Sequence, residues 1–345
     1  MKKSILVMAV AASMVASTAA VAEPKVYGNI HLSINAADND VPNADNNIKM
    51  SSNTSSLGVK GSEDLGDGLK AIYKAEWEID IAGDPTATPD AGNPKTSGSG
   101  LLTGRDQFVG LKGGFGAVKV GTMSSNYKQM GGKVDAFYRT PVEGRGLIKT
   151  QSSMHGGRGN INGRQTNTLQ YVSPKMGGIQ LVANTTFTGN NDETSGIGLR
   201  WSNKAFLVYA DWISGPTADT LTCTAPACDT ESAAKLGGKF HTKAFSVALQ
   251  YEAAEDRVGA DYIHAQGTFN INKNNMIGLT YGIQDRKELS VGGAPALAND
   301  STGLAVAYNH KMSKMTNVYV AYGARSEDQD NRDESMLSFG IRKKF

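Results

Sequence analysis

MLSFGIRKKF, at residues 336–345, ends the chain and decides which fold the rest of the sequence can form. Leu337, Phe339 and Ile341 alternate with polar or small residues, which is the period of a β-strand. Phe345 keeps the same phase as the last residue. A soluble domain has no need to end in this way, whereas a barrel in a membrane must pair its last strand with its first, because an open edge is unstable in lipid. We therefore expect a closed barrel whose assembly depends on Phe345.

The same alternation recurs earlier in the chain. In LKAIYKAEWEI, at residues 69–79, apolar and aromatic residues form one face, and Lys70, Lys74, Glu76 and Glu78 form the other. VYGNIHLSI, at residues 26–34, alternates in the same manner. Soluble sandwiches share this pattern, so it predicts half-buried strands without deciding whether they lie in a membrane.

The connections between the predicted strands alternate in length. Short connections rich in Gly, Asn and Lys lie at residues 63–68, 112–116, 174–178, 202–204, 241–243, 272–275 and 311–314. Long polar connections lie at residues 37–51, 82–103, 123–163, 189–193, 214–232, 253–257, 286–300 and 327–333. Short turns at one end, long loops at the other and an even number of strands are typical of outer-membrane barrels. The pattern predicts an all-β fold, a sixteen-stranded antiparallel transmembrane barrel with short periplasmic turns and long external loops.

The longest connection, which we call the inner loop, covers residues 123–163. It has no sustained period over roughly forty residues, and a loop of that length inside a compact domain is usually functional. It mixes the acids Asp135 and Glu143 with several Lys and Arg residues. Folded into a wide barrel, the inner loop would narrow the lumen and select which solutes pass. A mobile surface loop is the alternative.

The start of the chain predicts export. Lys2 and Lys3 precede an apolar run, and small residues end at Ala22, just before Glu23, which is the layout of a cleaved signal peptide. We expect a signal peptide at residues 1–22 and a barrel domain at residues 23–345. Removing the signal peptide takes away Lys2 and Lys3, and with them the formal net charge of +2. A charge-balanced chain argues against a nucleic-acid partner.

Three longer motifs together resemble a known family. They are GVKGSEDLGDGLKAIYKAEWEID at residues 58–80, GRDQFVGLKGGFGAVKVG at residues 104–121 and GIRKKF at residues 340–345. With them the mature chain resembles the general, trimeric, sixteen-stranded porins of Gram-negative outer membranes. The resemblance implies a homotrimer in outer-membrane lipid and lipopolysaccharide, inserted by the barrel-assembly machinery. It also implies an inner loop folded into the lumen and no cofactor.

The resemblance further implies a charged constriction. The basic cluster on the barrel wall would be Arg105, Arg164 and Lys60. The residues of the constricting loop would be Asp135, Glu143, Arg139 and Arg145. Opposed charges across a narrow water-filled gap would create a transverse field that orients dipolar solutes. Ser56 and Thr122 depart from the family pattern, where Arg is common, so the ion selectivity stays open. Alternatively, Arg105 and Arg164 are paired lumenal residues that fill the barrel.

The two cysteines predict a disulfide. Cys223 and Cys228 lie close together in a long loop, and an exported protein favours their oxidation. The small ring that they close would have a modest stabilising effect. A metal site would need two more ligands, for which Asp219 and Asp229 are poor candidates beside thiolates.

Neither a metal site nor an active site is expected. The five histidines are scattered, and no Ser lies in a Gly-x-Ser-x-Gly turn. A Ser/His/acid group of the kind found in an outer-membrane phospholipase would be assembled in space, and the sequence alone leaves it open. Acids such as Asp328, Asp330 and Asp333 are either solvated loop residues or a site for divalent cations and lipopolysaccharide phosphates.

Three functions fit this sequence. The first is a channel for passive diffusion of small hydrophilic solutes and ions, without enzymatic chemistry. The second is a substrate-specific porin for an anion or an oligosaccharide, which would show saturable block by that solute. The third is a non-conducting barrel that acts as an adhesin or a structural protein, which would show no conductance. In each case we expect the protein in the outer membrane of a Gram-negative bacterium.

Overall fold

The computed structural model describes residues 23–40, 47–83, 102–156, 163–189, 193–216, 230–286, 289–291, 294–296, 299–328 and 332–345. The predicted signal peptide at residues 1–22 lies outside the described residues. The predicted disulfide between Cys223 and Cys228 also lies outside them.

The described chain consists almost entirely of strands. The first strands are β1 (Lys25–Asn39), β2 (Ile48–Ser52), β3 (Ser56–Gly66), β4 (Leu69–Ile79), β5 (Leu102–Gly113), β6 (Gly116–Ser124), β7 (Arg164–Val172), β8 (Ile179–Thr186) and β9 (Ser195–Ser202). They are followed by β10 (Phe206–Pro216), β11 (Thr230–His241), β12 (Phe245–Ala253), β13 (Ala260–Asn270), β14 (Asn275–Arg286), β15 (Leu289–Val291), β16 (Ala294–Ala296), β17 (Ser301–Lys311), β18 (Thr316–Glu327) and β19 (Glu334–Lys344). The helical elements are α1 (Asn126–Val134), α2 (Glu255–Val258) and the 3₁₀ turn η2 (Ser153–His155).

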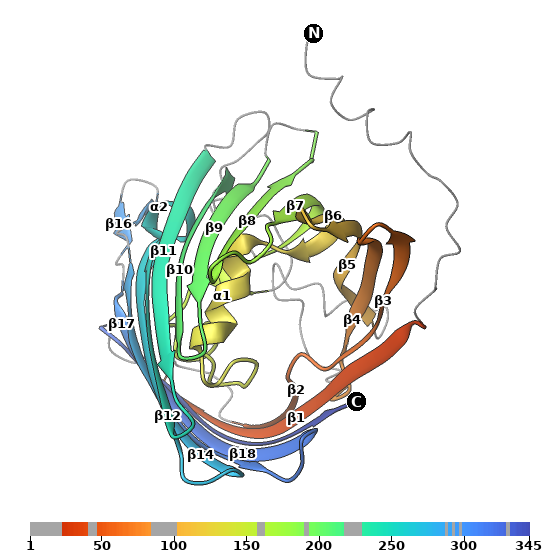
Figure 1. Cartoon of the computed structure of the whole chain (residues 1–345). Coiled ribbons are helices and arrows are strands. Elements are labelled where there is room, and N and C mark those ends of the chain that lie inside the picture. The colour runs from red at the N-terminus through yellow and green to blue at the C-terminus, as the bar shows by residue number, and fades with distance from the viewer. Residues whose placement is uncertain are drawn as a thin grey trace.

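The strands close into one antiparallel barrel, as predicted (Figure 1). Each long strand pairs with the next, and β19 pairs with β1 to complete the ring. Since β2 and β3 both pair with β1, they form one interrupted crossing, and the barrel has 16 strands. At the seam, the backbone N–H of Gly28 donates to the Phe345 carbonyl at 3.0 Å, and the Phe345 N–H donates back at 3.2 Å. The last residue of the chain therefore takes part in the pairing that removes the open edge.

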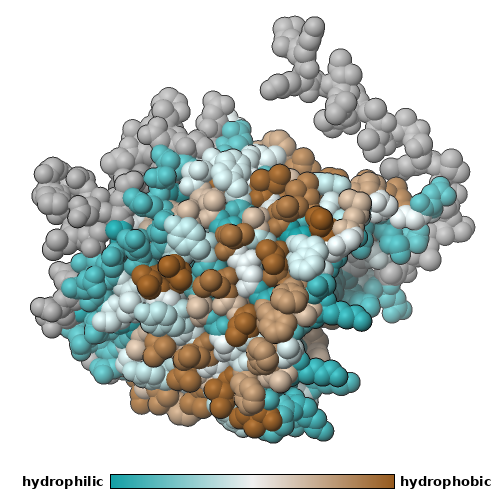
Figure 2. All heavy atoms as spheres, turned by 60° about the vertical axis from the view of Figure 1, so that its left-hand side comes forward, coloured by the Kyte–Doolittle hydropathy of each residue, from teal (hydrophilic) through white to brown (hydrophobic). Residues whose placement is uncertain are grey.

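The exposure of side chains is the reverse of that in a soluble protein, with apolar residues exposed and polar residues buried. Along β12, apolar Val247 and Leu249 are 49% and 58% exposed, whereas Gln250 and Glu252 on the other face are both 0% exposed. Figure 2 shows apolar side chains, in brown, over much of the outer surface in view. An outer face of this kind is suited to lipid, and the polar face lines the lumen. The alternation seen in the sequence therefore belongs to a membrane barrel and not to a soluble sandwich.

The inner loop lies inside the ring of strands, as predicted, and contains a helix that the sequence pattern did not predict (Figure 1). The side chain of Ser125 caps α1 by accepting a hydrogen bond from the Lys128 N–H at 3.2 Å. Gly131 and Gly132 let the returning chain pass closely, since a Cβ at Gly131 would lie 2.2 Å from the His155 ring. Tyr127, Met130 and Val134 share one face of α1, but the helix is short and Gly131 and Gly132 in its middle are weak helix formers, which hides it in the sequence. Among the described residues, no helix has the length and apolar character needed to cross a bilayer.

One wall of the barrel is lined by small residues on which the inner loop rests. Phe137, Val142 and Ile148 of the loop pack with Ala305, Ala307 and Ala321 of β17 and β18 in one buried cluster. Lumen-facing glycines bring the loop backbone still closer. A Cβ at Gly303 would lie 2.0 Å from the Ile148 carbonyl oxygen, and one at Gly323 would lie 2.7 Å from the Val142 side chain. The loop therefore contacts β14, β17 and β18 closely.

Replacing Gly303 with Ala should displace the inner loop and lower the stability of the barrel. The added methyl group meets backbone at 2.0 Å, which cannot yield as a flexible side chain would. We expect a loss of about 1–3 kcal/mol, the usual cost of overpacking, measured by thermal unfolding in detergent. Gly267→Ala is the matched control, because a Cβ there would have no neighbour within 4 Å. Equal melting temperatures for the two variants would contradict the close seating of the loop.

Candidate functional site

A β-bulge brings two neighbouring charges into the lumen together. Ala75 of β4 pairs with Gln107 of β5, but Trp77 pairs with Gly104, so Arg105 and Asp106 lie opposite Glu76 alone. In a regular strand, adjacent side chains point to opposite faces, and the extra residue of a bulge removes that restriction. Arg105 and Asp106 therefore both line the lumen.

The charges on this wall form a connected network of ion pairs. Arg105 donates from Nε to Glu76 Oε1 at 2.6 Å and from Nη1 to Glu78 Oε2 at 2.7 Å. Asp106 binds Lys74 Nζ at 3.0 Å and Arg164 Nε at 2.9 Å. The predicted wall arginines therefore meet here from separate strands, each paired with a carboxylate. This pairing holds their side chains in place and offsets most of their charge.

Lys60, the third residue of the predicted basic wall, lies beside this network. Its side chain is exposed, and its Nζ lies 4.8 Å from the centre of the Tyr27 ring. The Tyr27 hydroxyl in turn donates to Glu76 Oε2 at 2.8 Å. Cation–π contacts of this kind stabilise weakly at exposed positions, so Lys60 keeps its charge available to the lumen.

A large lumenal cavity of about 830 Å³ lies between this wall, α1 and the short-turn ends of β8 to β11. Nine cationic side chains line it, namely Lys74, Arg105, Lys119, Lys128, Lys133, Arg139, Arg164, Lys175 and Arg200. Among the described residues that line it, the carboxylates are those of Glu76 and Asp106. The cavity therefore has a positive excess after the ion pairs of the wall are counted.

The predicted loop acids brace the loop itself. The Asp135 carboxylate accepts the Phe137 N–H at 2.8 Å and the Gly144 N–H at 2.9 Å. The Glu143 carboxylate accepts the Arg139 N–H at 2.7 Å and Arg145 Nε at 2.6 Å. Neither carboxylate lines the large cavity, whereas Arg139 does. The loop therefore presents cations to the cavity and keeps these two acids among its own backbone groups.

Burial also changes how Asp135 ionises. It raises the pKa of this carboxyl group to about 7, and the nearby Glu143 carboxylate adds to the rise. The two backbone N–H donors act in the opposite direction, since they favour the charged form. Asp135 is therefore the loop acid whose charge changes near neutral pH.

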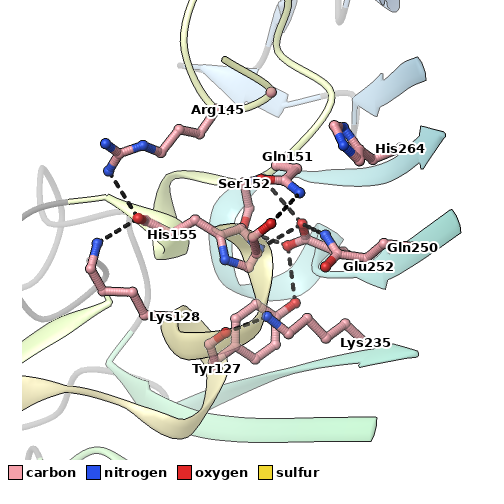
Figure 3. A network of polar contacts seen from close by, with 12 residues as sticks. Tyr127, Lys128, Arg145, Gln151, Ser152, His155, Lys235, Gln250, Glu252 and His264 are labelled. Atoms are coloured by element: carbon pink, nitrogen blue, oxygen red, sulfur yellow. Dashed lines mark hydrogen bonds and ion pairs between the residues drawn. The ribbon is translucent and has the colours of Figure 1, made fainter. Parts of the chain in front are cut away.

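A buried carboxylate on the opposite wall anchors the inner loop (Figure 3). Glu252 of β12 accepts hydrogen bonds from the Ser152 hydroxyl at 2.6 Å and the Tyr127 hydroxyl at 3.1 Å. Its Oε1 also lies 2.8 Å from His155 Nε2. Burial lowers the pKa of His155 to about 4, so the ring is neutral at pH 7. Glu252 therefore connects both ends of the inner loop to one strand.

A second set of contacts fixes the start of α1. Lys235 of β11 donates to the Tyr127 carbonyl, and its Nζ lies 4.1 Å from the centre of the Tyr127 ring. Asn126 donates to Asp211 Oδ1 at 3.2 Å, and its backbone N–H donates to Asn184 Oδ1 at 2.7 Å. These contacts come from β8, β10 and β11. Polar strands thus hold α1 and the 3₁₀ turn, while the small residues of β17 and β18 contact the middle of the loop.

The sequence analysis did not select these anchoring residues. One signal was present, because Glu252 shares its face with Gln250 in a strand whose other face is fully apolar. Among the described residues, no group of three or more His, Cys, Asp or Glu side chains is arranged to hold a metal ion.

A closed barrel with an apolar outer face and a charged loop folded into its lumen defines an outer-membrane protein of the porin type. The comparison with known families agrees, since the profile described as Gram-negative porin matches residues 9–331. The chain belongs to the Gram-negative porin family and is an outer-membrane protein.

Individual relatives add detail. The major outer membrane protein P.IB of Neisseria gonorrhoeae is 30% identical over 216 residues, which cover 60% of this chain and 55% of the relative. The chain thus matches little more than half the length of that curated relative. Among solved structures, the anion-selective porin from Comamonas acidovorans superposes with a TM-score of 0.74 at 19% identity, covering 94% of this chain and 99% of that one. The trimer form of OmpT from Vibrio cholerae gives 0.62 at 15% identity, covering 94% and 99%. At these identities the solved structures support the fold alone.

The raised pKa of Asp135 predicts that the free energy of unfolding falls as pH rises through this range. The neutral carboxyl group is favoured in the folded state, so its contribution is complete below the ordinary pKa near 4 and is lost as pH passes 7. Relative to Asp135→Asn, the wild type should lose up to about 1.4 kcal/mol per pH unit in this window, measured as unfolding free energy from pH 4 to 8. Asn provides one acceptor oxygen for two donors, which gives a constant offset. A pH-independent difference between the two proteins would refute the assignment.

Replacing Glu252 with Gln should loosen the inner loop. Tyr127, Ser152 and His155 would face an amide in place of a carboxylate, and at least one buried donor would lose its acceptor. We expect a loss of about 1–3 kcal/mol, measured by thermal or denaturant unfolding. Glu193→Gln, at an exposed loop residue, is the control. If both variants unfold alike, Glu252 does not anchor the loop.

Proposed function

We propose that this protein forms a water-filled channel through the outer membrane for passive diffusion of small hydrophilic solutes and ions, with a preference for anions. The observation that carries the proposal is the lumenal cavity of about 830 Å³, lined by nine Lys and Arg residues and by the acids Glu76 and Asp106. A lumen with an excess of one sign of charge concentrates ions of the other sign. No covalent chemistry is needed for this activity.

The proposal assigns roles to the charged residues. Arg105, Arg164 and Lys60 form the basic wall, and Arg139 of the inner loop faces the same lumen. Cations outside the ion-pair network, such as Lys119, contribute most to selection, because Lys119 donates to the neutral Gln170 and no carboxylate of the described residues forms an ion pair with it. Asp135, Glu143 and Arg145 set the conformation of the loop and act on the pore indirectly. The Comamonas acidovorans porin, which shares this fold, is described as anion-selective.

The wider assembly is also proposed. A homotrimer is supported by the solved trimer form of the OmpT barrel. We further propose cleavage of a signal peptide after Ala22, insertion by the barrel-assembly machinery, and contacts of the outer face with lipid and lipopolysaccharide. A disulfide between Cys223 and Cys228 would tie an external loop, and Phe345 would mark the end of the barrel for closure.

Neutralising two unpaired lumenal cations should reduce the anion preference. Lys119 lies on the wall and Lys133 at the end of α1, and both line the cavity. In planar bilayers under a salt gradient, the wild type should show anion-selective single-channel steps. In the double variant Lys119→Gln, Lys133→Gln, the anion-to-cation permeability ratio should fall roughly twofold or more, because each charge acts at close range in a confined lumen.

The turn variant Lys273→Gln is the control, since Lys273 is exposed and does not line the cavity. It should keep the wild-type reversal potential. Cation-selective wild-type channels would overturn the proposed ion preference. Folded wild-type protein without any current would overturn the channel itself and favour a structural or adhesive barrel.

A further inference from the structure

A second lumenal cavity lies on the other side of the inner loop. Its volume is about 490 Å³, and it opens between residues 136–140 of the loop and the short-turn ends of β17, β18 and β19. Tyr138 lines both this cavity and the larger one, so the tip of the inner loop stands between them. Volumes of a few hundred cubic ångströms are typical of small-molecule sites.

The charge of this second cavity is of one sign. Its cationic lining residues are Lys311, Lys314, Arg342 and Lys344. Among the described residues, no Asp or Glu lines the cavity, and none forms an ion pair with these four side chains. The second cavity therefore differs from the main wall, where carboxylates pair with the arginines. An anionic ligand would supply the missing counter-charge.

Arg342 is held ready for such a ligand. Its Nε donates to Asn29 Oδ1 at 2.6 Å, which fixes the plane of the guanidinium group and leaves its terminal nitrogens available. A fixed guanidinium fork matches the two oxygens of a carboxylate better than a flexible ammonium group does. The site therefore favours a planar oxyanion at this position.

Apolar and aromatic side chains form another part of the lining, beside polar ones such as Asn309 and Thr316. Phe137 and Tyr138 come from the loop, and Met276, Met315 and Tyr319 come from the barrel. The Tyr319 hydroxyl lies 2.9 Å from Nε2 of the His31 ring, which fixes the orientation of the Tyr319 side chain. Aromatic faces and thioether sulfur both pack well against an aromatic ring. A ligand without an apolar or aromatic group would leave these side chains without a packing partner.

A buried polar atom at the cavity gives a second, independent indication. His31 lines the cavity and is 1% exposed, and its Nδ1 has no hydrogen-bond partner among the described residues. Asn29 Nδ2, next to the Arg342 contact, is likewise buried without one. Unpaired buried polar groups are costly, and these two lie in the wall of the barrel close to Arg342.

We propose that this cavity is a binding site for a small aromatic carboxylate. The carboxylate would lie against Arg342, with Lys344 and the Lys311–Lys314 turn adding charge, and the ring would lie among Phe137, Tyr138 and Tyr319. The inference rests on the proposed channel only for access, because the ligand must reach the lumen. With this site, the short-turn end of the pore would select solutes by chemical class as well as by the sign of their charge.

Isothermal titration of the folded wild-type assembly in detergent tests the site. Benzoate should bind saturably, and inorganic phosphate and benzyl alcohol should each bind at least about tenfold more weakly, since each satisfies half of the cavity. Arg342→Gln should weaken benzoate about tenfold, and Lys314→Gln, in an exposed turn, should weaken it by a smaller factor without affecting folding. Lys273→Gln, in a neighbouring exposed turn, should bind benzoate as the wild type does.

Several outcomes would overturn the site. Absence of benzoate binding would do so, as would equal affinity for phosphate or for benzyl alcohol. Equal benzoate affinity in Lys314→Gln and Lys273→Gln would show that the Lys311–Lys314 turn does not contribute to binding. Unchanged affinity in folded Arg342→Gln would show that the carboxylate does not lie against Arg342.

A current measurement separates this inference from the proposed function. Benzoate added to the short-turn side of an open wild-type channel should reduce the current in a saturable manner, and less so in Arg342→Gln. If the channel conducts but benzoate neither blocks the current nor binds in the calorimeter, the site is contradicted and the channel is not. Calorimetric binding without any current contradicts the channel but not the site.

Discussion

The constraint on which this structure depends is that lipid offers no hydrogen-bond partner to a backbone. The ring must close, and it does so from β1 to β19, with Gly28 and Phe345 completing the pairing. The outward face of each strand must also be apolar, so the strands turn most of their polar side chains to the lumen. Carboxylates such as Glu76 and Asp106 then have to find cations inside the barrel, and the ion-pair network of the wall is the result.

A barrel of this width cannot be filled by strand side chains alone, and the inner loop takes part of the remaining space. The lumen accommodates it with two different surfaces. Small residues of β14, β17 and β18 admit its backbone, and polar residues of β8 to β13 bind α1 and the 3₁₀ turn. The charges of β4 to β6 line the large cavity that remains. The position of the pore is therefore a consequence of where the loop is held.

The strands could be predicted because they need only a period of two. LKAIYKAEWEI was predicted at residues 69–79, and β4 has the same bounds. The period alone does not say which face points outward, and burial shows that Val247 faces outward and Glu252 inward. Arg105 was expected on the lumenal wall, but the lumenal position of Asp106 beside it was hidden, because it depends on a register shift between two strands. Helix α1 was missed because it is short and contains Gly131 and Gly132, which are weak helix formers.

The contacts of Glu252 also bear on the order of assembly. They join β12 to Tyr127 and His155, which lie 125 and 97 residues earlier in the chain. Contacts across such sequence separations form late, since they need the intervening strands in place. We infer that the inner loop docks only after β7 to β13 have paired. Until then the nascent barrel is wider inside than the finished one, and the narrowing of the pore is among the last steps of its maturation.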